Sequence, residues 1–512
     1  MDPRILEARK LEIEQLKSCD TWKLVPRTKG THVIGSRFVD VQKKDSDGKP
    51  GIFKSRLVAQ GYSMIEGVEF FDTFAPVARP YSIRVFFTIS VTNELLIYQG
   101  DVKNAFVQAK LSEQVYMKQP EGFEEFPHGK QVPMVCELKR AIYGTKQAAN
   151  AWYKELSTYL LSIGFTASVY EKCIFTRGRS IDKDYVILIL IVDDFLAGVK
   201  EQAIWDKFMN ELISKYPVKD MGTVKRFVGM QISRQGDRGS LILSQEPAMD
   251  EMLNHFGMTD CNTRDTPMLS NLKIESTGGV ENKTDKPYRS LIGSLLYPTQ
   301  WTRPDLSFSV GMLSRFNNNP SEYHWKLAMD VLRYVKLTKS YRIKYTKATE
   351  LCHYAHADSE WLGDTNDCKF TYGFITFLDN NLLHWKSKRS GGVAGSTTAA
   401  ELESAYMALT HMLWERDLFR SLGIQTSAMK IYNDNMALVK ILNGDKMLDR
   451  TKYMAVKIEF IREYIKKNQL EVIHISNTQM KADIFTKSLG RTLFKRSVEM
   501  LGLNEFSSEE EC

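Results

Sequence analysis

No apolar run in the sequence is long enough to cross a membrane as a helix, which excludes a membrane-spanning role. The amino terminus, MDPRILEARKLEIEQLKSCDTW, is charged throughout and lacks the apolar core of a secretion signal. We therefore expect the chain to stay in a reducing intracellular compartment, where disulfides rarely form. The seven cysteines include no CxxC pair and the nine histidines no HExxH or HxxxH spacing, so the common structural zinc sites are excluded as well.

Length and composition favour a folded chain with several domains. At 512 residues the chain exceeds one ordinary core, which predicts two to four domains. Its 43% hydrophobic and 26% charged residues are typical of globular proteins. A formal net charge of +7 permits a polyanionic partner without requiring one. We interpret the acidic end, SSEEEC, as a solvated terminus.

One stretch organises the rest of the chain: YVILILIVDDFLAGV, residues 185–199, in which two adjacent aspartates interrupt an apolar run. Its apolar segments are short and β-branched, which favours two buried strands that meet at Asp193 and Asp194. A carboxylate pair at the tip of a buried hairpin suits a divalent metal better than it suits stability. The alternative interpretation is a solvated acidic turn, and partners elsewhere in the sequence must decide between the two.

A candidate partner for this pair lies upstream. The segment LLIYQGDVKNAF predicts a strand that ends at Asp101, followed by a helix or turn that carries Phe106. Because about 90 residues separate Asp101 from Asp193, only tertiary folding brings the two together.

Turn and helix signals complete the first two thirds of the chain. The turn DSDGKPG predicts a β-hairpin whose return strand carries Lys54 and Arg56, and these two cations suit a phosphate. The alternative is an exposed strand edge protected by charge. We expect a helix over 148–163, ended by Gly164 and packed beneath the central hairpin. Further expected elements are helices over 5–16, 202–216, 246–255, 288–297, 305–316 and 323–337, strands over 225–232 and 239–245, and an exposed linker over 266–289.

Four carboxylates stand at the ends of predicted elements in the final third of the chain. A strand, LCHYAHAD, ends near Asp358, and a long helix that begins near Thr398 carries Glu401 beside its apolar face. The strand MKIYND ends at Asp434, and Asp483 stands in or just before a helix. Each acid alone is most often a surface residue, whereas the shared position at element ends favours one common site.

A series of motifs runs through the chain in a fixed order: WKLVP, SRLVAQGY, TFAPVARPYSIR, GDVKNAF, VYMKQPEGF, YGTKQAANAWY, IVDD, FVGMQI, YRSLIGSLLY, TRPDLSFSV, ADSEWLGD, IYNDN and KADIFTKSL. From about Trp22 to Leu503 the chain thereby resembles the reverse transcriptase and ribonuclease H (RNase H) of copia-type long-terminal-repeat retrotransposon Pol polyproteins. The resemblance implies an α+β and α/β multidomain fold, with a right-hand polymerase of fingers, palm and thumb, followed by an RNase H-like mixed sheet with helices. The implied domains are an N-terminal helix (1–21), fingers and palm (22–265), a linker and helical thumb or connection region (266–350), an RNase H-like domain (351–490), and a C-terminal helix with an acidic tail (491–512).

Residue by residue, the resemblance implies that Asp101, Asp193 and Asp194 hold the metals of the polymerase site. Three like charges resist ionisation together unless cations neutralise them, and the implied cofactor is a pair of Mg²⁺ ions, with Mn²⁺ as a substitute. The implied partners are an RNA template, a DNA primer strand and deoxynucleoside triphosphates (dNTPs). The implied nucleotide-binding residues are Lys54, Arg56, Phe106, which excludes ribonucleotides, and Gln147; the implied primer-positioning residues are Phe227, Val228, Gly229 and Met230.

In the last domain the resemblance assigns the RNase H carboxylates, which are Asp358, Glu401, Asp434 and Asp483. With two further metal ions they would cleave the RNA strand of an RNA:DNA hybrid, recognised by its 2′ hydroxyl groups and groove shape. The implied location is a virus-like particle in the cytoplasm, with the nucleus as a second compartment, and the implied protein partners are an element-encoded capsid and integrase. The chain itself has no DTG or DSG protease triplet, no integrase zinc cluster and no zinc knuckle.

Several positions depart from the pattern of this family. Ile191 stands where Tyr usually precedes VDD, and Ala399 replaces one of two glutamates in the helix that carries Glu401. The other departures are Ala149, Asn150, Tyr453, Ala455 and Glu459. All seven predicted metal carboxylates remain. The first hypothesis is therefore an RNA-directed DNA polymerase with RNase H; the alternatives are a catalytically decayed nucleic-acid-binding relic, motivated by the departures, and a nuclease without polymerase function.

Overall fold

The computed structural model describes residues 2–44, 50–126, 133–180, 182–270, 272, 274, 283–361, 369–444 and 453–505. The chain divides into two compact units, and each is discontinuous in sequence. Unit 1 contains residues 1–78, 98–178 and 184–222; unit 2 contains residues 79–97, 179–183 and 223–512. The turn predicted at 45–49, part of the linker predicted at 266–289 and the acidic tail lie outside the described residues.

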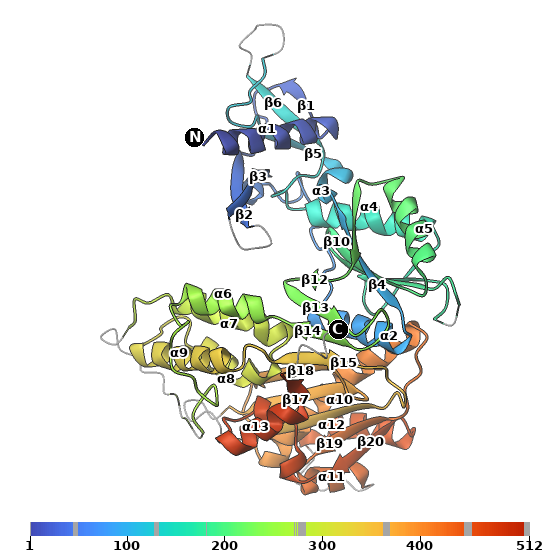
Figure 1. Ribbon diagram of the computed structural model, residues 1–512, viewed down its shortest axis with the longest axis vertical. Coiled ribbons are helices and arrows are strands. Elements are labelled where there is room, and N and C mark those ends of the chain that lie inside the picture. The colour runs from blue at the N-terminus through green and yellow to red at the C-terminus, as the bar shows by residue number, and fades with distance from the viewer. Residues whose placement is uncertain are drawn as a thin grey trace. The chain divides into compact units, whose positions relative to one another are not determined.

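A six-stranded sheet with the order β11-β4-β10-β9-β8-β7 forms the centre of unit 1 (Figure 1). Strands β9 (Val186–Ile191) and β10 (Asp194–Val199) pair antiparallel, with Asp194 opposite Ile191. Nearly all of their side chains are buried, as expected of short apolar strands covered on both faces. The predicted central hairpin is therefore confirmed. The other strands of this sheet are β4 (Leu96–Val102), β7 (Thr166–Ala167), β8 (Ile174–Arg177) and β11 (Val218–Thr223).

The loop of this hairpin has a strained backbone that a neighbouring helix supports. Val192 has a φ of 59°, a left-handed conformation that is costly for a β-branched residue. The indole Nε1–H of Trp152, on α4 (Ala148–Ser162), donates a hydrogen bond to the Val192 carbonyl at 2.7 Å. Helix α4 ends just before Gly164, whose φ of 90° stops the helix, as predicted. The hydrogen bond from Trp152 joins this predicted helix to the loop of the hairpin.

Helix α1 (Pro3–Ser18) packs against the hairpin of β2 (Ser36–Lys44) and β3 (Pro50–Ala59), and both elements match the predictions. The buried Glu12 carboxylate accepts a hydrogen bond from the Leu57 backbone N–H at 3.1 Å. This contact joins the helix to the strand that carries Lys54 and Arg56. The remaining elements of unit 1 are the three-stranded sheet of β1 (Trp22–Pro26), β6 (Met134–Arg140) and β5 (Lys110–Lys118), with η1 (Gly61–Ser63), α3 (Ala105–Gln108) and α5 (Gln202–Ile213).

Unit 2 contains two five-stranded sheets. The first has the order β12 (Arg226–Phe227), β13 (Met230–Arg234), β14 (Leu241–Ser244), β15 (Arg342–Tyr345) and β21 (Leu503–Asn504). Strand β21 pairs with β15, a long-range contact that the sequence did not predict. The predicted helices are confirmed as α6 (Glu246–His255), α7 (Tyr288–Trp301), α8 (Ser307–Ser314), which follows η4 (Pro304–Leu306), and α9 (Glu322–Leu337).

The second sheet of unit 2 has the order β18-β17-β16-β19-β20. Strands β16 (His353–Glu360), β17 (Thr371–Leu378) and β18 (Asn381–Arg389) form an antiparallel meander, and β19 (Met429–Asn433) and β20 (Leu470–His474) continue it in parallel. The predicted apolar face of α10 (Thr397–Ser421) packs on this sheet. This is the RNase H-like mixed sheet. Its remaining helices are α11 (Met436–Asn443), α12 (Ala455–Lys466), η6 (Asn477–Gln479), η7 (Asp483–Phe485) and α13 (Arg491–Met500).

None of the helices in the described ranges is both long and apolar enough to span a bilayer.

Helix α2 (Pro80–Thr92) precedes β4 in the sequence but belongs to unit 2, where it contacts β15 and β18. Its Arg84 side chain is 3% exposed. The Arg84 guanidinium donates hydrogen bonds to the carbonyl oxygens of Leu383 (2.6 Å) and Gln300 (2.9 Å). It also lies 3.9 Å from the ring centroid of Trp385. Arg84 therefore fastens α2 to the RNase H-like sheet.

Replacement of Arg84 by Ala is expected to destabilise unit 2 by about 3 kcal/mol, because buried carbonyl groups lose their charged donor. Urea unfolding followed by circular dichroism measures the change. Arg179→Ala is the matched control: its side chain is 79% exposed, and its effect should stay within about 0.5 kcal/mol. Equal stability of Arg84→Ala and the unmodified chain would contradict the role assigned to Arg84.

Candidate active sites

The three predicted polymerase carboxylates lie on neighbouring strands of unit 1. Asp101 is near the end of β4, Asp193 is in the loop between β9 and β10, and Asp194 is the first residue of β10. Strands β4 and β10 are adjacent in the sheet, and the Val102 backbone N–H donates to the Asp193 carbonyl at 2.8 Å. The Gln99 side-chain amide donates to both Asp194 carboxylate oxygens, at 2.9 and 3.2 Å. Gln99, which the sequence analysis missed, stands two residues before Asp101 and therefore on the same strand face.

The protein balances the charges of these carboxylates only in part. Burial raises the pKa of Asp194 to about 6, and Asp101 and Asp193 add repulsion that the Gln99 hydrogen bond only partly opposes. Burial also raises the pKa of Asp193, with Asp101 acting in the same direction and Arg56 and Lys54 in the opposite one. A cation bound between these carboxylates would lower the raised pKa values of both Asp193 and Asp194.

A cleft of about 720 Å³ in unit 1 brings predicted metal-binding acids together with predicted triphosphate-binding cations. Asp101 and Asp193 line it, and so do Lys54 and Arg56 of β3. Tyr143, which the sequence analysis missed, also lines this cleft. Phe106 reaches the site through Tyr143, because the two rings pack edge to face with centroids 4.8 Å apart. The cleft therefore combines carboxylates with cations, the pattern that a metal-bound triphosphate requires.

Gln147, which was also predicted to bind the nucleotide, does not line this cleft. Its side chain is buried and lines a separate cavity of about 630 Å³, not the cleft of Asp101. Its amide donates to the Glu69 carbonyl at 2.9 Å. A motif gives the position of a residue in the sequence, but the direction of its side chain depends on the packing around it.

The segment predicted to hold the primer end is a tight hairpin in unit 2, not a single strand as expected. Phe227 of β12 pairs with Met230 of β13. Val228 and Gly229 form the turn, with φ values of 47° and 73°. The Tyr297 hydroxyl donates to the Val228 carbonyl, and a Cβ at Gly229 would lie 2.2 Å from this hydroxyl oxygen. Two residues with positive φ end the strand, and a period-two pattern over so few residues does not reveal such a turn.

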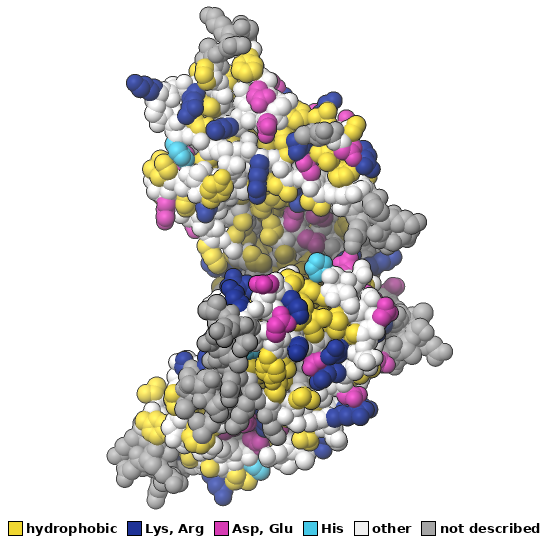
Figure 2. Space-filling model, turned by 90° about the vertical axis from the view of Figure 1, so that its left-hand side faces the viewer, with side chains coloured by type: hydrophobic (Ala, Val, Ile, Leu, Met, Phe, Trp, Pro, Cys, Tyr) yellow, Lys and Arg dark blue, Asp and Glu magenta, His cyan; other side chains and the backbone are white. Residues whose placement is uncertain are grey.

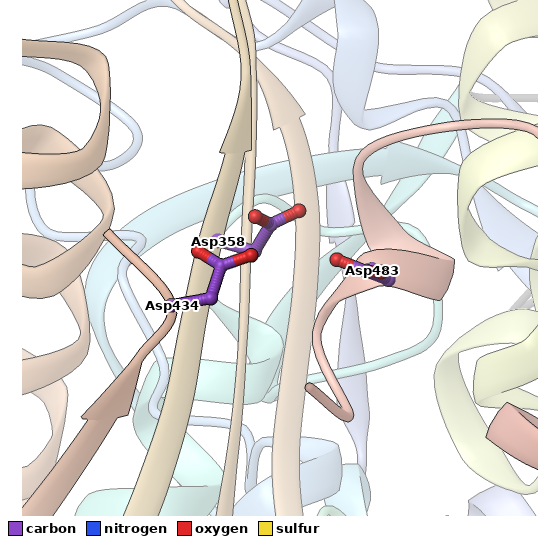
Figure 3. Close-up of side chains that lie close together, drawn as sticks. All are labelled: Asp358, Asp434 and Asp483. Atoms are coloured by element: carbon purple, nitrogen blue, oxygen red, sulfur yellow. The ribbon is translucent and has the colours of Figure 1, made fainter. Parts of the chain in front are cut away.

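Three of the four predicted RNase H carboxylates meet in unit 2 (Figure 3). Asp358 belongs to β16, Asp434 directly follows the parallel neighbour β19, and Asp483 begins η7. One oxygen of each lies within 4.8 Å of the others. Asp358 is 2% and Asp483 9% exposed. Adjacent strands bring Asp358 and Asp434 together, and the loop after β20 adds Asp483.

The fourth carboxylate, Glu401, is buried in the first turns of α10. It accepts hydrogen bonds from the Asn433 side-chain amide at 2.9 Å and from the Ser359 backbone N–H at 3.3 Å. Burial, together with the nearby charge of Asp358, holds the pKa of Glu401 well above its usual range. Glu401 is thus held next to strands β16 and β19.

Lys487 is a residue of this site that the sequence analysis missed. Its ammonium lies 2.9 Å from an Asp483 carboxylate oxygen and 3.9 Å from one of Asp358. The neighbouring Thr486 hydroxyl donates a hydrogen bond to Asp358. Burial and the Asp358 charge still raise the pKa of Asp483 to about 7, although Lys487 opposes them. The i, i+4 spacing of Asp483 and Lys487 in KADIFTK was the available signal.

The donor set fits a hard divalent cation. Among the residues described, the only group of metal-ligating side chains found is that of Asp358, Asp434 and Asp483, and it offers oxygen alone. Oxygen ligands suit Mg²⁺ and Mn²⁺, whereas zinc sites are built mainly from histidine and cysteine. Figure 2 shows basic and acidic side chains interspersed on the face in view, so charge alone marks no nucleic-acid surface there.

The chain is similar to known proteins over most of its length. Residues 19–270 match the family described as reverse transcriptase (RNA-dependent DNA polymerase). The chain is 35% identical over 509 residues to the retrovirus-related Pol polyprotein from transposon RE2 of Arabidopsis thaliana, which covers 98% of this chain and 34% of that protein. It is 31% identical to the Pol polyprotein from transposon TNT 1-94 of Nicotiana tabacum, over 98% of this chain and 38% of that one. A transposon Ty5-1 protein of Saccharomyces cerevisiae is 32% identical over 57% of this chain and 93% of its own length.

A solved foamy viral protease-reverse transcriptase in complex with double-stranded DNA shares the fold, with a TM-score of 0.51 and 12% identity over 93% of this chain and 70% of that one. Fold and family match together place the chain in the reverse transcriptase class, with an RNase H-like sheet in unit 2. The chain belongs to the copia-type retrotransposon Pol family, and it spans about a third of the length of the plant Pol polyproteins.

The contact between Gly100 and Phe195 leads to a test of the polymerase site. A Cβ at Gly100 of β4 would lie 2.3 Å from the Phe195 ring of β10. Gly100→Ala should therefore separate β4 from β10, displace Asp101 from Asp194 and lower primer extension by roughly a hundredfold. Phe195→Leu in the same chain removes the clash and should restore most of the rate. If the double variant extends primers no faster than Gly100→Ala alone, the steric explanation is wrong.

The effect of Mg²⁺ on the stability of the fold should depend on pH. Carboxyl groups with raised pKa values stabilise the metal-free fold below their ordinary pKa of 3.8, and this stability is lost as pH rises through about 6 for Asp194 and about 7 for Asp483. Mg²⁺ should therefore raise the melting temperature at pH 7.5 and change it little at pH 4.5, as thermal shift assays with and without a chelator would measure. Asp483→Asn should reduce the Mg²⁺ effect at pH 7.5; an equal Mg²⁺ effect at both pH values would contradict the proposed metal sites.

Proposed function

We propose that this chain is an RNA-directed DNA polymerase with an attached RNase H that copies retrotransposon RNA into DNA. The observation that carries the proposal is that one chain with a reverse transcriptase fold contains two separate clusters of carboxylates. Asp101, Asp193 and Asp194 would serve the polymerase, and Asp358, Glu401, Asp434 and Asp483 the nuclease. The domains are proposed as 1–21, 22–265, 266–350, 351–490 and 491–512, following the order of the motifs.

In the polymerase site, Asp101, Asp193 and Asp194 would hold two Mg²⁺ ions. When bound, these ions lower the pKa of the primer 3′ hydroxyl and neutralise the charge that develops on the phosphates. Lys54 and Arg56, in the same cleft, would bind the triphosphate.

The organic parts of the substrates would contact other residues. Phe106 would exclude the ribose 2′ hydroxyl. Gln147 is proposed to line the nucleotide pocket only after its side chain leaves the separate cavity that it now lines. The hairpin turn of Phe227, Val228, Gly229 and Met230 would support the primer end.

In the nuclease site, the four acids would hold two metal ions against the RNA strand of a hybrid. Asp358 and Asp483 now share the ammonium of Lys487, so this lysine would turn toward the phosphate backbone when metal replaces it. The proposed partners are an RNA template, a DNA primer, dNTPs and an RNA:DNA hybrid, with Mg²⁺ as cofactor and Mn²⁺ as a substitute. An element-encoded capsid and integrase, and a virus-like particle in the cytoplasm with the nucleus as a second compartment, complete the proposal.

Four of the seven sequence departures are compatible with an active enzyme. Tyr453 is 65% exposed, and Glu459 is a half-exposed side chain paired with Arg462. Ala399 packs against the apolar core beneath α10, and Ile191 is half-buried opposite Asp194. These four positions leave the seven carboxylates in place.

Primer extension with RNA as template tests the polymerase. Asp193→Asn combined with Asp194→Asn should lower Mg²⁺-dependent DNA synthesis by at least roughly a thousandfold, because the charges that hold the metals are lost. Asp206→Asn, an exposed acid on α5, is the matched control and should keep the activity. Undiminished synthesis by the double variant would refute the assignment.

Cleavage of a labelled RNA:DNA hybrid by the same preparations tests the nuclease. Asp358→Asn should abolish cleavage while extension continues, with the exposed Glu463→Gln as its control. Cleavage without extension by the unmodified chain would favour a nuclease lacking polymerase function. Salt-sensitive hybrid binding with neither reaction would favour the relic.

A further inference from the structure

We propose that Tyr143 is a specificity-determining residue of the polymerase site, whose ring fixes Phe106 relative to Arg56 so that deoxyribonucleotides are selected over ribonucleotides. This inference rests on the proposed polymerase function, in which Phe106 screens the sugar and Arg56 binds the triphosphate. Tyr143 is the first residue of the motif YGTKQAANAWY, but the sequence assigned it no role.

A single ring contacts both of the residues concerned. The Phe106 ring packs edge to face on Tyr143 at a centroid distance of 4.8 Å and an interplanar angle of 68°. The Arg56 guanidinium carbon lies 4.8 Å from the centroid of the same ring. Tyr143 also lines the cleft of Asp101 and Asp193. It therefore lies where the residues for sugar, triphosphate and metal meet.

The backbone of Tyr143 is joined to the strand that carries Arg56. Its carbonyl accepts a hydrogen bond from the Ala59 N–H of β3 at 2.7 Å. The next residue, Gly144, has a φ of 91°, and a Cβ there would lie only 2.1 Å from the Ala59 carbonyl oxygen. The close approach fixes the distance between the ring and β3. Moving the two segments apart would break the hydrogen bond from Ala59 to Tyr143, and moving them together would make Gly144 clash with the Ala59 carbonyl.

The same short segment is joined to the helix that carries Phe106. The Arg140 guanidinium donates to the carbonyl oxygens of Val107 and Gln108 in α3, at 3.2 and 2.9 Å. The Ala141 N–H donates to the Ala109 carbonyl at 3.0 Å. Residues 140–144 thus connect α3 with β3, and the Tyr143 side chain fills the space between their functional residues.

This connection bears directly on sugar selection. A nucleotide anchored by its triphosphate at Arg56 places its 2′ carbon at a set distance, and Phe106 excludes a hydroxyl only if it stays at that distance. The Tyr143 ring makes the contacts with Phe106 and Arg56, and its phenol stays neutral because burial raises the pKa of Tyr143. The ring, and not the hydroxyl, is therefore the part that acts.

Single-nucleotide incorporation tests the proposal, with poly(rU) as template, oligo(dA) as primer, and dATP or ATP as substrates that differ only in the 2′ hydroxyl. Tyr143→Ala should reduce the ratio of kcat/KM for dATP to that for ATP by roughly tenfold, since Phe106 loses its packing partner. It should also raise the KM for dATP, since Arg56 loses the ring. Tyr143→Phe should behave as the unmodified chain. Tyr143→Leu, which keeps the volume without an aromatic face, should raise the KM while retaining most of the selectivity.

Two comparisons separate the possible results. In a double-mutant cycle, Phe106→Ala should lower selectivity much less when Tyr143 is already Ala, and fully additive effects would overturn the proposal. An unchanged selectivity ratio in a folded Tyr143→Ala protein would overturn it too. Tyr170→Ala, an exposed tyrosine that does not line the cleft, is the matched control and should leave both constants unchanged. Absence of incorporation by the unmodified chain would refute the polymerase function itself, and the inference with it.

Discussion

The cost of burying carboxylates, to which their mutual repulsion adds, is the constraint on which both candidate sites depend: the acids are half-buried in unit 1 and mostly buried in unit 2. In each unit, acids stand at the ends of strands, where the backbone is rigid and the side chains cannot move apart at low cost. The protein opposes this repulsion only in part. Gln99 donates to Asp194, Asn433 donates to Glu401, and Lys487 contacts Asp483. What remains is a negative potential that a divalent cation is suited to neutralise.

The elements that the sequence predicted are those with strong local patterns. The hairpin around Asp193 follows from two short apolar runs, and α4 follows from helical periodicity ended by Gly164. The carboxylates at strand ends were also found, because a strand that ends in an acid is visible in the sequence. The order of the motifs then added the fold family, which no single pattern could have identified.

The features that the sequence did not reveal depend on contacts between distant segments. Tyr143 is functional only because β3 and α3 fold to either side of it. Gln147 is drawn into a different cavity by the Glu69 carbonyl. The turn at Val228 depends on Tyr297, a residue of another helix. Hydrophobic periodicity reports which face of an element is buried, but it does not say which partner covers that face.

The membership of α2 in unit 2 has a consequence for synthesis of the chain. Ten consecutive residues of this helix, from Ser82 to Val91, are buried, and they are covered by strands such as β15 and β18 that the ribosome makes much later. During synthesis the apolar surface of α2 therefore stays exposed until these strands are made. An exposed apolar surface of this kind promotes aggregation or binding by a chaperone. A truncated copy of the element that retains the polymerase motifs but lacks the later strands would keep this surface exposed permanently. In such an element, loss of the C-terminal part of the chain would therefore also leave α2, a helix in the N-terminal part of the sequence, without the strands that bury it.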